Sequence, residues 1–571
     1  MTAEVIAARG LRVSYGKVEA LRGVDLSIAQ GEIFGLIGPD GAGKTTALDV
    51  LAGILEPSGG AATVLGKSPR DARDDVGFLP QRFALFADLS VDENLAYVAG
   101  LRGVPRSEYE ERRERYLRLM GIERFGGRLA RQLSGGMKQK LALCAALVAA
   151  PRILLLDEPT TGVDPLSRRD FWRVIKSLAQ ESLTIAIATP DLEEAGRCDR
   201  VALLYDGEVR RLGTPADLSA ALGLDRLEIR TPSIVAAERA VAALGDGRGI
   251  EDVQSFGDRL DVLVRRGSEF DSVLGDELAR AGVAVASIER AGPTLENVFV
   301  ETLRELRPEP PFVAFPRSRP PRPVGGVAIE ARGLVKDFGP FRAVDRLDLT
   351  VSYGEMYGLL GANGAGKTTT IKMLCGLLPR TEGTVMLGGQ EHDLRSPALR
   401  RRIGYMSQKF TLYEDLTVRE NLDFYAGVYD VPRAERARKI AWVLESSGLE
   451  GHGDTVVGSL PGGWRQRVAF GASVMHEPEL LFLDEPTSGV DPLARRQFWR
   501  LIEAFARDGT AVLVTTHYMD EAQHCGRIAL MAEAHKVAEG TPSEVVASVP
   551  GARSLDDAFV AIVERAGSRA A

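Results

Sequence analysis

Runs of apolar residues that predict buried strands occur in matching pairs along this chain. EIFGLIG (32–38) and EMYGLLG (355–361) are each followed by a glycine-rich turn that opens a helix-like stretch. RILLLD (152–157) and ELLFLD (479–484) are unbroken apolar runs that end in an acidic residue. Such runs are typical of strands buried inside a sheet, and ligands of open α/β sheets bind at the carboxyl ends of the strands. The pattern predicts an α/β fold that is written twice.

The spacing between matching residues indicates a duplication of the whole unit. Lys367 minus Lys44 is 323, whereas Glu485 minus Glu158 is 327. One small insertion after the first helix of the second copy explains the difference. Self-similarity of this kind is the sequence signature of repeated domains. We therefore predict two copies of one domain.

Material of another kind lies between the copies. Residues 225–303 alternate short apolar runs with the helix-like stretch SIVAAERAVAALG, which predicts a small α+β appendage. Residues 308–323 contain seven prolines, so we expect an extended, semi-rigid linker there. In chain order, the predicted domains are a first repeat (1–222), the appendage (223–303), the linker (304–326), a second repeat (327–546) and a C-terminal tail (547–571).

Length and composition exclude several classes of protein. A chain of 571 residues is too long for one hydrophobic core, and its net charge of −8 argues against a nucleic-acid backbone as the main ligand. The longest apolar run, 141–150, is too short to span a bilayer, and the N-terminus has no secretory pattern. Four cysteines make neither a disulfide framework nor a metal cluster. We expect a protein of the reducing cytoplasm that does not itself cross a membrane.

A phosphate-binding loop of the form G-x-x-x-x-G-K-T follows the first apolar run of each copy. It reads GPDGAGKTT at 38–46 and GANGAGKTT at 361–369. Glycines let successive backbone N–H groups surround phosphate oxygens, the helix N-terminus adds partial positive charge, and the lysine reaches the β and γ phosphates. The threonine after the lysine ligates Mg²⁺. The predicted residues are Gly38, Gly41, Gly43, Lys44, Thr45 and Thr46 in the first copy and Gly361, Gly364, Gly366, Lys367, Thr368 and Thr369 in the second, with Thr45 and Thr368 on the metal.

A second pair of candidate residues ends the other apolar strand of each copy. Asp157 and Asp484 are suited to the outer shell of the metal. Glu158 and Glu485 are placed to orient or deprotonate an attacking water. A lone Asp-Glu pair is as often an ordinary solvated strand end. The phosphate loop in the same copy favours the catalytic interpretation.

Five motifs follow one another in the same order in each copy. They are the phosphate loop, Gln81 or Gln408, LSGGMKQ (133–139) or LPGGWRQ (460–466), LLLDEP or LFLDEP, and the turn GVDP. In this order they resemble the nucleotide-binding cassette of ABC-type ATPases, and the resemblance covers both copies. It implies two tandem P-loop ABC nucleotide-binding domains, each with a RecA-like core and a helical subdomain, that hydrolyse ATP with Mg²⁺ as cofactor.

The resemblance also implies roles outside the phosphate loop. In that family two cassettes meet head to tail, so that each ATP lies between one copy's phosphate loop and the other copy's signature, LSGGMKQ or LPGGWRQ. A histidine, here His517, senses the γ-phosphate. The other implied residues are Ser134, Gly135, Gly136, Gly462 and Gly463 of the signatures, Gln81 and Gln408 at ATP and the metal, and Tyr15 and Phe338 stacked on adenine. An alternative for the two aromatics, as residues at the edge of the core, stays open.

The copies differ at two of these positions. Pro461 stands where the first copy has Ser134, and Pro190 stands where the second copy has His517. Proline lacks a backbone N–H, and its side chain can neither donate to nor accept from a phosphate. The first turn of a helix tolerates proline, so we expect Pro461 to preserve the fold while removing contacts to the nucleotide.

Head-to-tail pairing assigns both losses to one composite site. The site built on Lys44, with Glu158, lacks its histidine and receives the altered signature LPGGWRQ. The site built on Lys367, with Glu485 and His517, keeps every element. We hypothesise that the first site binds ATP and turns it over slowly, whereas the second performs most hydrolysis.

The whole chain is similar to the fused double-cassette ATP-binding subunits of bacterial ABC-2-type multidrug exporters. The stretch 405–429, the segments TLENVFV and SLDDAFV, and the altered LPGG carry this resemblance. It implies two ABC-2-type transmembrane permease subunits and a periplasmic adaptor protein as partners, with this chain peripheral on the cytoplasmic face of the membrane. The candidate docking residues are Phe83, Leu85 and Phe86 in the first copy and Phe410, Leu412 and Tyr413 in the second, with burial in the core as the alternative.

A soluble twin-cassette ATPase that acts on ribosomes is the competing interpretation. Members of that group also carry two cassettes on one chain, but they join them by a long charged helical linker that reaches into RNA. Here the join is a compact appendage and a proline-rich strap, and the chain is acidic overall. We therefore favour the exporter and expect no nucleic-acid partner.

Overall fold

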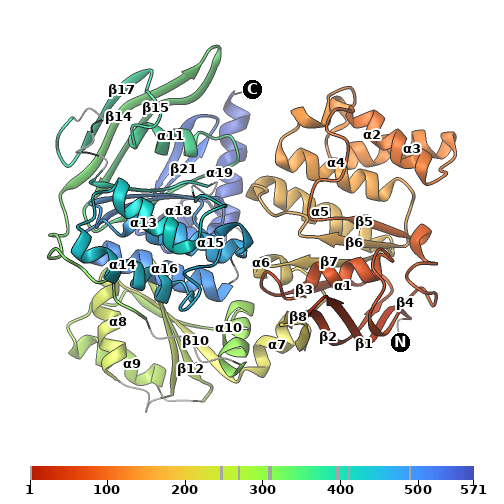
Figure 1. Ribbon diagram of the computed structural model, residues 1–571, viewed down its shortest axis with the longest axis horizontal. Helices are drawn as coiled ribbons and strands as arrows, with labels where there is room; N and C mark the ends of the chain where they lie inside the picture. The colour runs from red at the N-terminus through yellow and green to blue at the C-terminus, as the bar shows by residue number, and fades with distance from the viewer. Residues whose placement is uncertain are drawn as a thin grey trace. The chain divides into compact units, whose positions relative to one another are not determined.

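The computed structural model describes residues 3–244, 249–267, 270–306, 312–391, 396, 399, 401–408, 412–487, 490 and 492–570. The chain forms two compact units (Figure 1). Unit 1 consists mainly of Met1–Leu222 and Pro293–Pro308, and unit 2 mainly of Gly223–Gly292, Glu309–Ser488 and Leu493–Ala571. The α/β class and the duplication are confirmed, whereas the domain boundaries stay a prediction.

Unit 1 contains a six-stranded sheet and a three-stranded antiparallel sheet around one core. The first has the order β5 (Val76–Leu79), β6 (Ile153–Asp157), β7 (Thr184–Thr189), β3 (Ile33–Ile37), β8 (Arg200–Tyr205), β9 (Glu208–Gly213), and the second the order β2 (Val18–Ala29), β1 (Glu4–Tyr15), β4 (Gly59–Val64). Its helices are α1 (Lys44–Leu51), α2 (Val91–Leu101), α3 (Arg106–Leu119), α4 (Gly135–Leu147), α5 (Pro165–Gln180), α6 (Leu192–Ala195), α7 (Pro215–Ala221) and α10 (Leu295–Leu306).

Unit 2 repeats these sheets in the same order. They are β18 (Ile403–Met406), β19 (Leu480–Asp484), β20 (Ala511–Thr516), β16 (Met356–Gly361), β21 (Arg527–Ala532), β22 (His535–Gly540), and β15 (Phe341–Ser352), β14 (Val327–Phe338), β17 (Glu382–Leu387). The matching helices are α11 (Lys367–Leu374), α13 (Val418–Val428), α14 (Arg433–Ser446), α15 (Gly462–Val474), α16 (Pro492–Arg507), α17 (Met519–Ala522), α18 (Pro542–Ala547) and α19 (Leu555–Ala570).

The central strands explain the unbroken apolar runs of the sequence. Strands β3, β6 and β7 are buried at every residue, and they pair in parallel with their neighbours. Helix α1 packs between the two sheets, with its apolar side chains in the same core as β1 and β3. Since parallel strands align their carboxyl ends, the phosphate loop after β3 and the acidic residues after β6 meet at one edge of the sheet.

Residues 223–292 of the predicted appendage belong to unit 2, although they follow the first copy in the sequence, whereas its last residues, from Pro293, belong to unit 1. Its antiparallel sheet has the order β11 (Ile250–Ser255), β12 (Arg259–Arg265), β10 (Leu224–Arg230), β13 (Ser287–Ala291), with helices α8 (Ile234–Ala243) and α9 (Phe270–Arg280) (Figure 1). Apolar side chains of β10, β12, α8 and α9 form a core of their own. This confirms the predicted α+β character. It also shows that sequence neighbours need not share a unit.

The proline-rich segment, described from residue 312, lies along unit 2 without helix or strand. Trp442 Nε1 donates to the Val313 carbonyl at 3.0 Å. The backbone N–H groups of Ser318 and Arg319 donate to the Glu477 carboxylate at 2.8 and 3.0 Å. These contacts tie the segment to the second copy.

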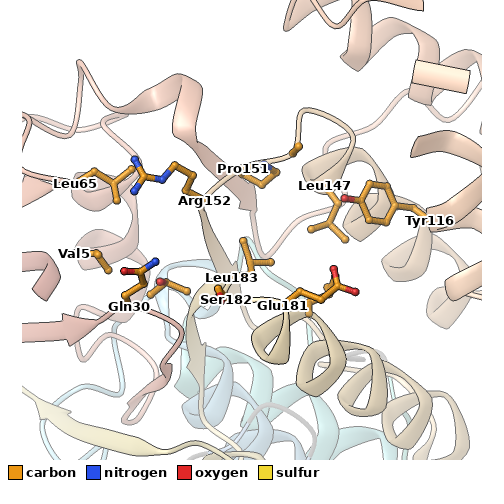
Figure 2. A pocket seen from close by; sticks show the side chains of 13 residues that line it. Val5, Gln30, Leu65, Tyr116, Leu147, Pro151, Arg152, Glu181, Ser182 and Leu183 are labelled. Atoms are coloured by element: carbon orange, nitrogen blue, oxygen red, sulfur yellow. The ribbon is translucent and has the colours of Figure 1, made fainter. Parts of the chain in front are cut away.

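Unit 1 has a pocket of about 220 Å³ at the amino ends of β6 and β7. Figure 2 shows Val5, Gln30 and Leu65 on one side of it and Tyr116 and Leu147 on the other. The pocket lies at the opposite end of these strands from their acidic residues, so it is separate from the phosphate loop. None of the described helices combines the length and apolar character that a bilayer crossing requires.

Candidate functional site

The phosphate loops have the backbone shape that their glycines allow. Gly43 and Gly366 precede α1 and α11 with φ angles of 103° and 105°. A Cβ atom on Gly43 would lie 2.6 Å from the Ala20 carbonyl oxygen, and one on Gly366 would lie 2.4 Å from that of Ala343. Both the left-handed φ and the close approach therefore require glycine. The threonines that follow each lysine occupy the first turn of the helix.

The loop lysines are buried and point back across their own loops. Lys44 Nζ donates to the carbonyl oxygens of Gly38 at 2.7 Å and Pro39 at 3.0 Å. Lys367 Nζ donates in the same way to Gly361 at 2.7 Å and Ala362 at 3.1 Å. Each side chain is 5% exposed. A positive charge is thus held at the mouth of each loop, where it can reach a phosphate.

The aspartates that end β6 and β19, Asp157 and Asp484, are buried carboxylates. Asp484 Oδ1 accepts from Thr368 Oγ1 at 3.1 Å and from Thr515 Oγ1 at 2.5 Å. Within the described residues, no hydrogen-bond donor reaches Asp484 Oδ2. Burial raises the pKa of Asp484, and it raises that of Asp157 to about 6. Thr515 was not predicted as a site residue from the sequence. The first copy has Ala188 at the matching position, so it lacks this hydroxyl.

The predicted catalytic glutamates share an unusual backbone. Glu158 has a φ of 47° and Glu485 a φ of 51°, a region that costs energy for residues other than glycine. Gln81 Nε2 donates to Glu158 Oε2 at 2.9 Å, and Gln408 Nε2 donates to Glu485 Oε2 at 2.7 Å. Each unit thereby brings its glutamine and glutamate together beside the phosphate loop. Sequence patterns carry no signal for this strained φ.

The environment of the two glutamates differs at one further position. His517, which is 1% exposed, places Nδ1 3.1 Å from Glu485 Oε1. Burial on its own raises the pKa of Glu485, but His517, the charge of Lys367 and the hydrogen bond from Gln408 together hold that pKa below its ordinary value. The first copy has Pro190 at the matching position. Its side chain has no polar atom to offer to Glu158.

The signature segments begin equivalent helices. Ser134 is the N-cap of α4, and its Oγ accepts from the Met137 N–H at 3.3 Å. Pro461 occupies the N-cap of α15 with a φ of −54°, and it provides no side-chain cap. Both helices have 13 residues. The predicted glycines, Gly135 and Gly136 in α4 and Gly462 and Gly463 in α15, form the first turn in each case.

The first strand of each copy ends in one aromatic residue. Tyr15 is 52% exposed at the end of β1, and Phe338 is 48% exposed at the end of β14. Both side chains are thus partly accessible for stacking. Lys336 Nζ lies 5.0 Å from the centroid of the Phe338 ring.

The predicted docking residues divide between surface and interior. Phe86 and Tyr413 are half exposed, whereas Leu412 is buried and belongs to the interior. Phe83 and Leu85 are partly buried and line a cavity of about 140 Å³. Phe410 lies outside the described residues.

Matching apolar side chains extend this exposed surface in both copies. Phe86 packs edge-to-face on Tyr97 with ring centroids 5.0 Å apart, and Tyr413 packs on Phe424 in the same way at 5.0 Å. One helical turn further on, Leu101 and its counterpart Val428 are also exposed. Sequence reasoning missed Tyr97, Leu101, Phe424 and Val428. Their spacing of four residues on α2 and α13 was the available signal.

Comparison with known proteins gives one consistent family. A family model described as ABC transporter matches residues 21–161 and 344–488, and a model of an AAA domain matches 467–519. The chain is 38% identical to the probable multidrug ABC transporter ATP-binding protein YbhF of Escherichia coli, over 99% of this chain and 98% of that protein.

Two further similarities are more limited. A 224-residue segment, 39% of this chain, is 38% identical to the Nod factor export ATP-binding protein I of Cupriavidus metallidurans and covers 74% of that protein. The structure also resembles archaeal ribosome recycling factor aABCE1, solved with the ribosomal stalk protein aP1, with a TM-score of 0.57. That match covers 91% of this chain and 87% of the other at 21% sequence identity, so it shows the fold alone.

Proposed function

We propose that this chain, which belongs to the ABC transporter family of ATP-binding proteins, powers export through separate ABC-2-type permease subunits. The family makes it an ATPase. Export is supported by likeness over the full length to a protein named for multidrug transport and over one cassette to a protein named for Nod factor export. We place the chain on the cytoplasmic face of the membrane, with two permease subunits and a periplasmic adaptor in the same system.

Magnesium fits the predicted metal residues. A carboxylate oxygen that is buried without a donor, as Asp484 Oδ2 is among the described residues, needs a cation to offset the cost of its burial. Hard oxygen ligands from threonine, aspartate and glutamine are those that Mg²⁺ prefers. We propose that Thr368, Asp484 and Gln408 hold Mg²⁺ in unit 2 and that Thr45, Asp157 and Gln81 hold it in unit 1. The ion would neutralise charge on the β and γ phosphates of ATP.

We further propose that the two sites work unequally. Glu485 is in contact with His517 and Gln408, so an attacking water could be oriented from two sides. Glu158 keeps only Gln81 of these two partners, because Pro190 replaces the histidine. If the cassettes pair head to tail, the site of Glu158 also receives Pro461 where the other receives Ser134. The single observation that supports this asymmetry is that Glu485 lies against His517, whereas the copy of Glu158 has Pro190 at the position of that histidine.

Exchanging each glutamate for its amide tests the asymmetry. We expect Glu485→Gln to lower the ATPase kcat by about 10² or more, since a positioned general base contributes about 10² to 10⁴. Glu158→Gln should lower it by about two-fold or less, since its site contributes little turnover. Steady-state ATPase assays on the purified full chain measure both. Equal losses in the two variants would contradict the asymmetry.

Permease docking is expected at the exposed aromatic surface of each copy. We define these as patch 1 (Phe86, Tyr97 and Leu101) and patch 2 (Tyr413, Phe424 and Val428). Exposed aromatic residues that cluster at one place typically mark a protein–protein contact. The matching positions in the two copies suit two similar permease chains.

Substituting one residue of each patch tests this docking. We expect the double variant Tyr97→Ser with Phe424→Ser to lose co-purification with hydrophobic membrane subunits while keeping the ATPase activity of the isolated chain. Leu119→Ser, an exposed apolar residue on α3 outside both patches, is the matched control. Unchanged co-purification would reject the patches. Co-sedimentation of the unaltered chain with ribosomes, and not with membranes, would overturn the proposed export function.

A further inference from the structure

The turn 256–258 between β11 and β12 of the appendage touches the segment that follows His517 in unit 2. The Gly257 N–H donates to the Gln523 carbonyl at 2.7 Å. A Cβ atom on Gly257 would lie 1.9 Å from the Cys525 carbonyl oxygen and 2.8 Å from the Gly526 nitrogen. The φ of Gly257 is outside the left-handed region. Close backbone approach alone therefore requires glycine at this position.

Aromatic rings continue the contact into the second copy. Phe256 lies against His524 with ring centroids 4.8 Å apart. His524 stacks in turn on Trp499 of α16, at 4.7 Å and an interplanar angle of 6°. Arg259 Nη2 donates to Gln523 Oε1 at 3.1 Å. The turn thus adds a ring to a stack whose other members belong to the cassette.

Two further polar contacts hold the appendage on the second copy. Asp252 of β11 pairs with Arg496 of α16, and these side chains are 8% and 3% exposed. Asp258 Oδ2 accepts from the Ser543 N–H in α18 at 3.0 Å. Buried charged pairs tolerate little displacement, because separating them leaves an uncompensated charge. The turn is therefore held in one position on the cassette.

The contacted segment is joined to the hydrolytic residues through α17. Glu521 of α17 accepts from Thr516 Oγ1 at 2.7 Å and from the hydroxyl of Thr487. Thr516 directly precedes His517, and Thr487 follows Glu485 by two residues. Gln523 follows directly on the helix. A shift of the segment 523–526 would consequently move α17 and change how His517 meets Glu485.

The matching segment of unit 1 uses a side chain of its own instead. Arg197 stands at the position of His524, and it pairs with Glu193 at 2.6 Å. Its guanidinium carbon lies 5.9 Å from the centroid of Trp172, the counterpart of Trp499. The aromatic stack with the appendage is thus found in the copy that carries His517.

We propose that the turn 256–258 is a positioning element for His517, which makes the appendage a device that sets turnover at the site of Glu485. This inference rests on the proposed role of His517. The turn contacts Gln523, His524 and Ser543, and it acts by fixing α17. Since the appendage continues the chain from the first copy, it links the first copy covalently to the turn that contacts the segment 523–526 of the second.

One added methyl group tests the proposal in the full chain. Gly257→Ala forces the turn away from Cys525, and a displacement of about 1 Å far from the chemistry can cost about 10² in rate. We expect kcat for ATP to fall about ten-fold or more with little change in KM. Hydrogen exchange of the amides in 519–526 should become faster. Phe256→Ala, which removes the ring and creates no clash, should change both quantities in the same direction.

Matched variants separate positioning from general damage. Gly275→Ala makes the same change within α9, where the new Cβ would lie 3.8 Å from Ile288 Cδ1, an ordinary contact. It should behave as the unaltered chain in both measurements. In a His517→Ala background, Gly257→Ala should cause no further loss of kcat, because coupled residues are not additive.

Three outcomes would overturn the inference. Gly257→Ala and Phe256→Ala could both keep the kcat of Gly275→Ala, or their losses could multiply with that of His517→Ala. In either case His517→Ala alone would still be slow, so the proposed function would stand. If His517→Ala kept full activity, the proposed role of the histidine would fail first, and the inference would fall with it.

Discussion

The imidazole of His476 is buried in unit 2 and cannot easily accept a charge. It stacks on Tyr429 with ring centroids 3.9 Å apart, and its Nε2 donates to the Ile403 carbonyl at 3.0 Å. Burial lowers its pKa to about 4. An unfolded histidine has a pKa of about 6.5, so the unfolded state binds the proton first as the pH falls. The neutral histidine therefore contributes stability above pH 6.5 that is lost as the pH falls toward 4.

This shift predicts an acid-sensitive unit 2. A difference of about 2.5 pKa units corresponds to at most about 3 to 4 kcal/mol of stability between pH 6.5 and 4. We expect the thermal midpoint of unit 2 to fall over this range, and to fall less in His476→Phe. Scanning calorimetry at pH 7, 5.5 and 4.5 measures the midpoints. His452→Phe, at an exposed histidine, should keep the slope of the unaltered chain, and an equal change of slope in the two variants would contradict the assignment.

At the scale of single elements, a helix can keep its fold after losing its cap. Helices α4 and α15 each start directly after the signature residue, although Ser134 offers a hydroxyl and Pro461 none. A proline at this position costs no intrahelical hydrogen bond, because the first N–H groups of a helix have no partner within it. A substitution at this residue can thereby change the groups offered to a nucleotide while the helix stays folded.

Ser134→Pro tests whether the first copy can likewise keep its fold after this substitution while its activity changes. We expect unit 1 to remain folded, with a loss of about 1 kcal/mol from the missing cap. ATPase activity should fall by about 10² to 10³, the cost of one lost transition-state donor. Thermal unfolding and steady-state ATPase assays measure the two effects. Pro461→Ala is the matched control in the second copy and should change the activity little, whereas full activity in Ser134→Pro would show that the hydroxyl and N–H are dispensable.

At the scale of the whole molecule, the two copies share one fold and differ in residues of the candidate site. Sheets, helices and phosphate loops match in order. At the candidate site the copies differ at a few positions, among them Pro190, Pro461 and Ala188, and residues 223–292 of the appendage belong to unit 2. Because the scaffold is common to both copies, the losses should be reversible.

Restoring the lost residues tests this reversibility. In a Glu485→Gln background, we expect Pro190→His together with Pro461→Ser to raise the residual ATPase kcat by about ten-fold or more, since each restored contact is expected to contribute on the order of 10². The gain should vanish when Glu158→Gln is added, which assigns it to the first site. A restored chain with unchanged activity would show that other residues had also diverged.

Much of the site was predictable because its chemistry is local in the sequence. The phosphate loops, the Asp-Glu strand ends and the glutamines are short motifs, and the structure brings Lys367, Gln408, Glu485 and His517 together as the order of motifs indicated. Of the two alternatives left open for Leu412, the structure shows burial, and the sequence could not decide because an apolar residue in a loop has no periodicity that separates a docking face from a packing face. The positive φ of Glu485 likewise could not be predicted from any sequence pattern.

The sequence by itself determined the duplication, the fold class, the residues of each phosphate loop and the two prolines that distinguish the copies. These follow from residue identity and spacing, which are properties of the chain alone. Only the tertiary structure decided that the appendage rests on the second copy. Gly257 lies against the backbone of Cys525, although the two residues are far apart in the sequence. A glycine needed for close backbone approach cannot be distinguished in sequence from one needed for a turn. Packing between distant segments depends on the shapes of both surfaces, and those shapes exist only after folding.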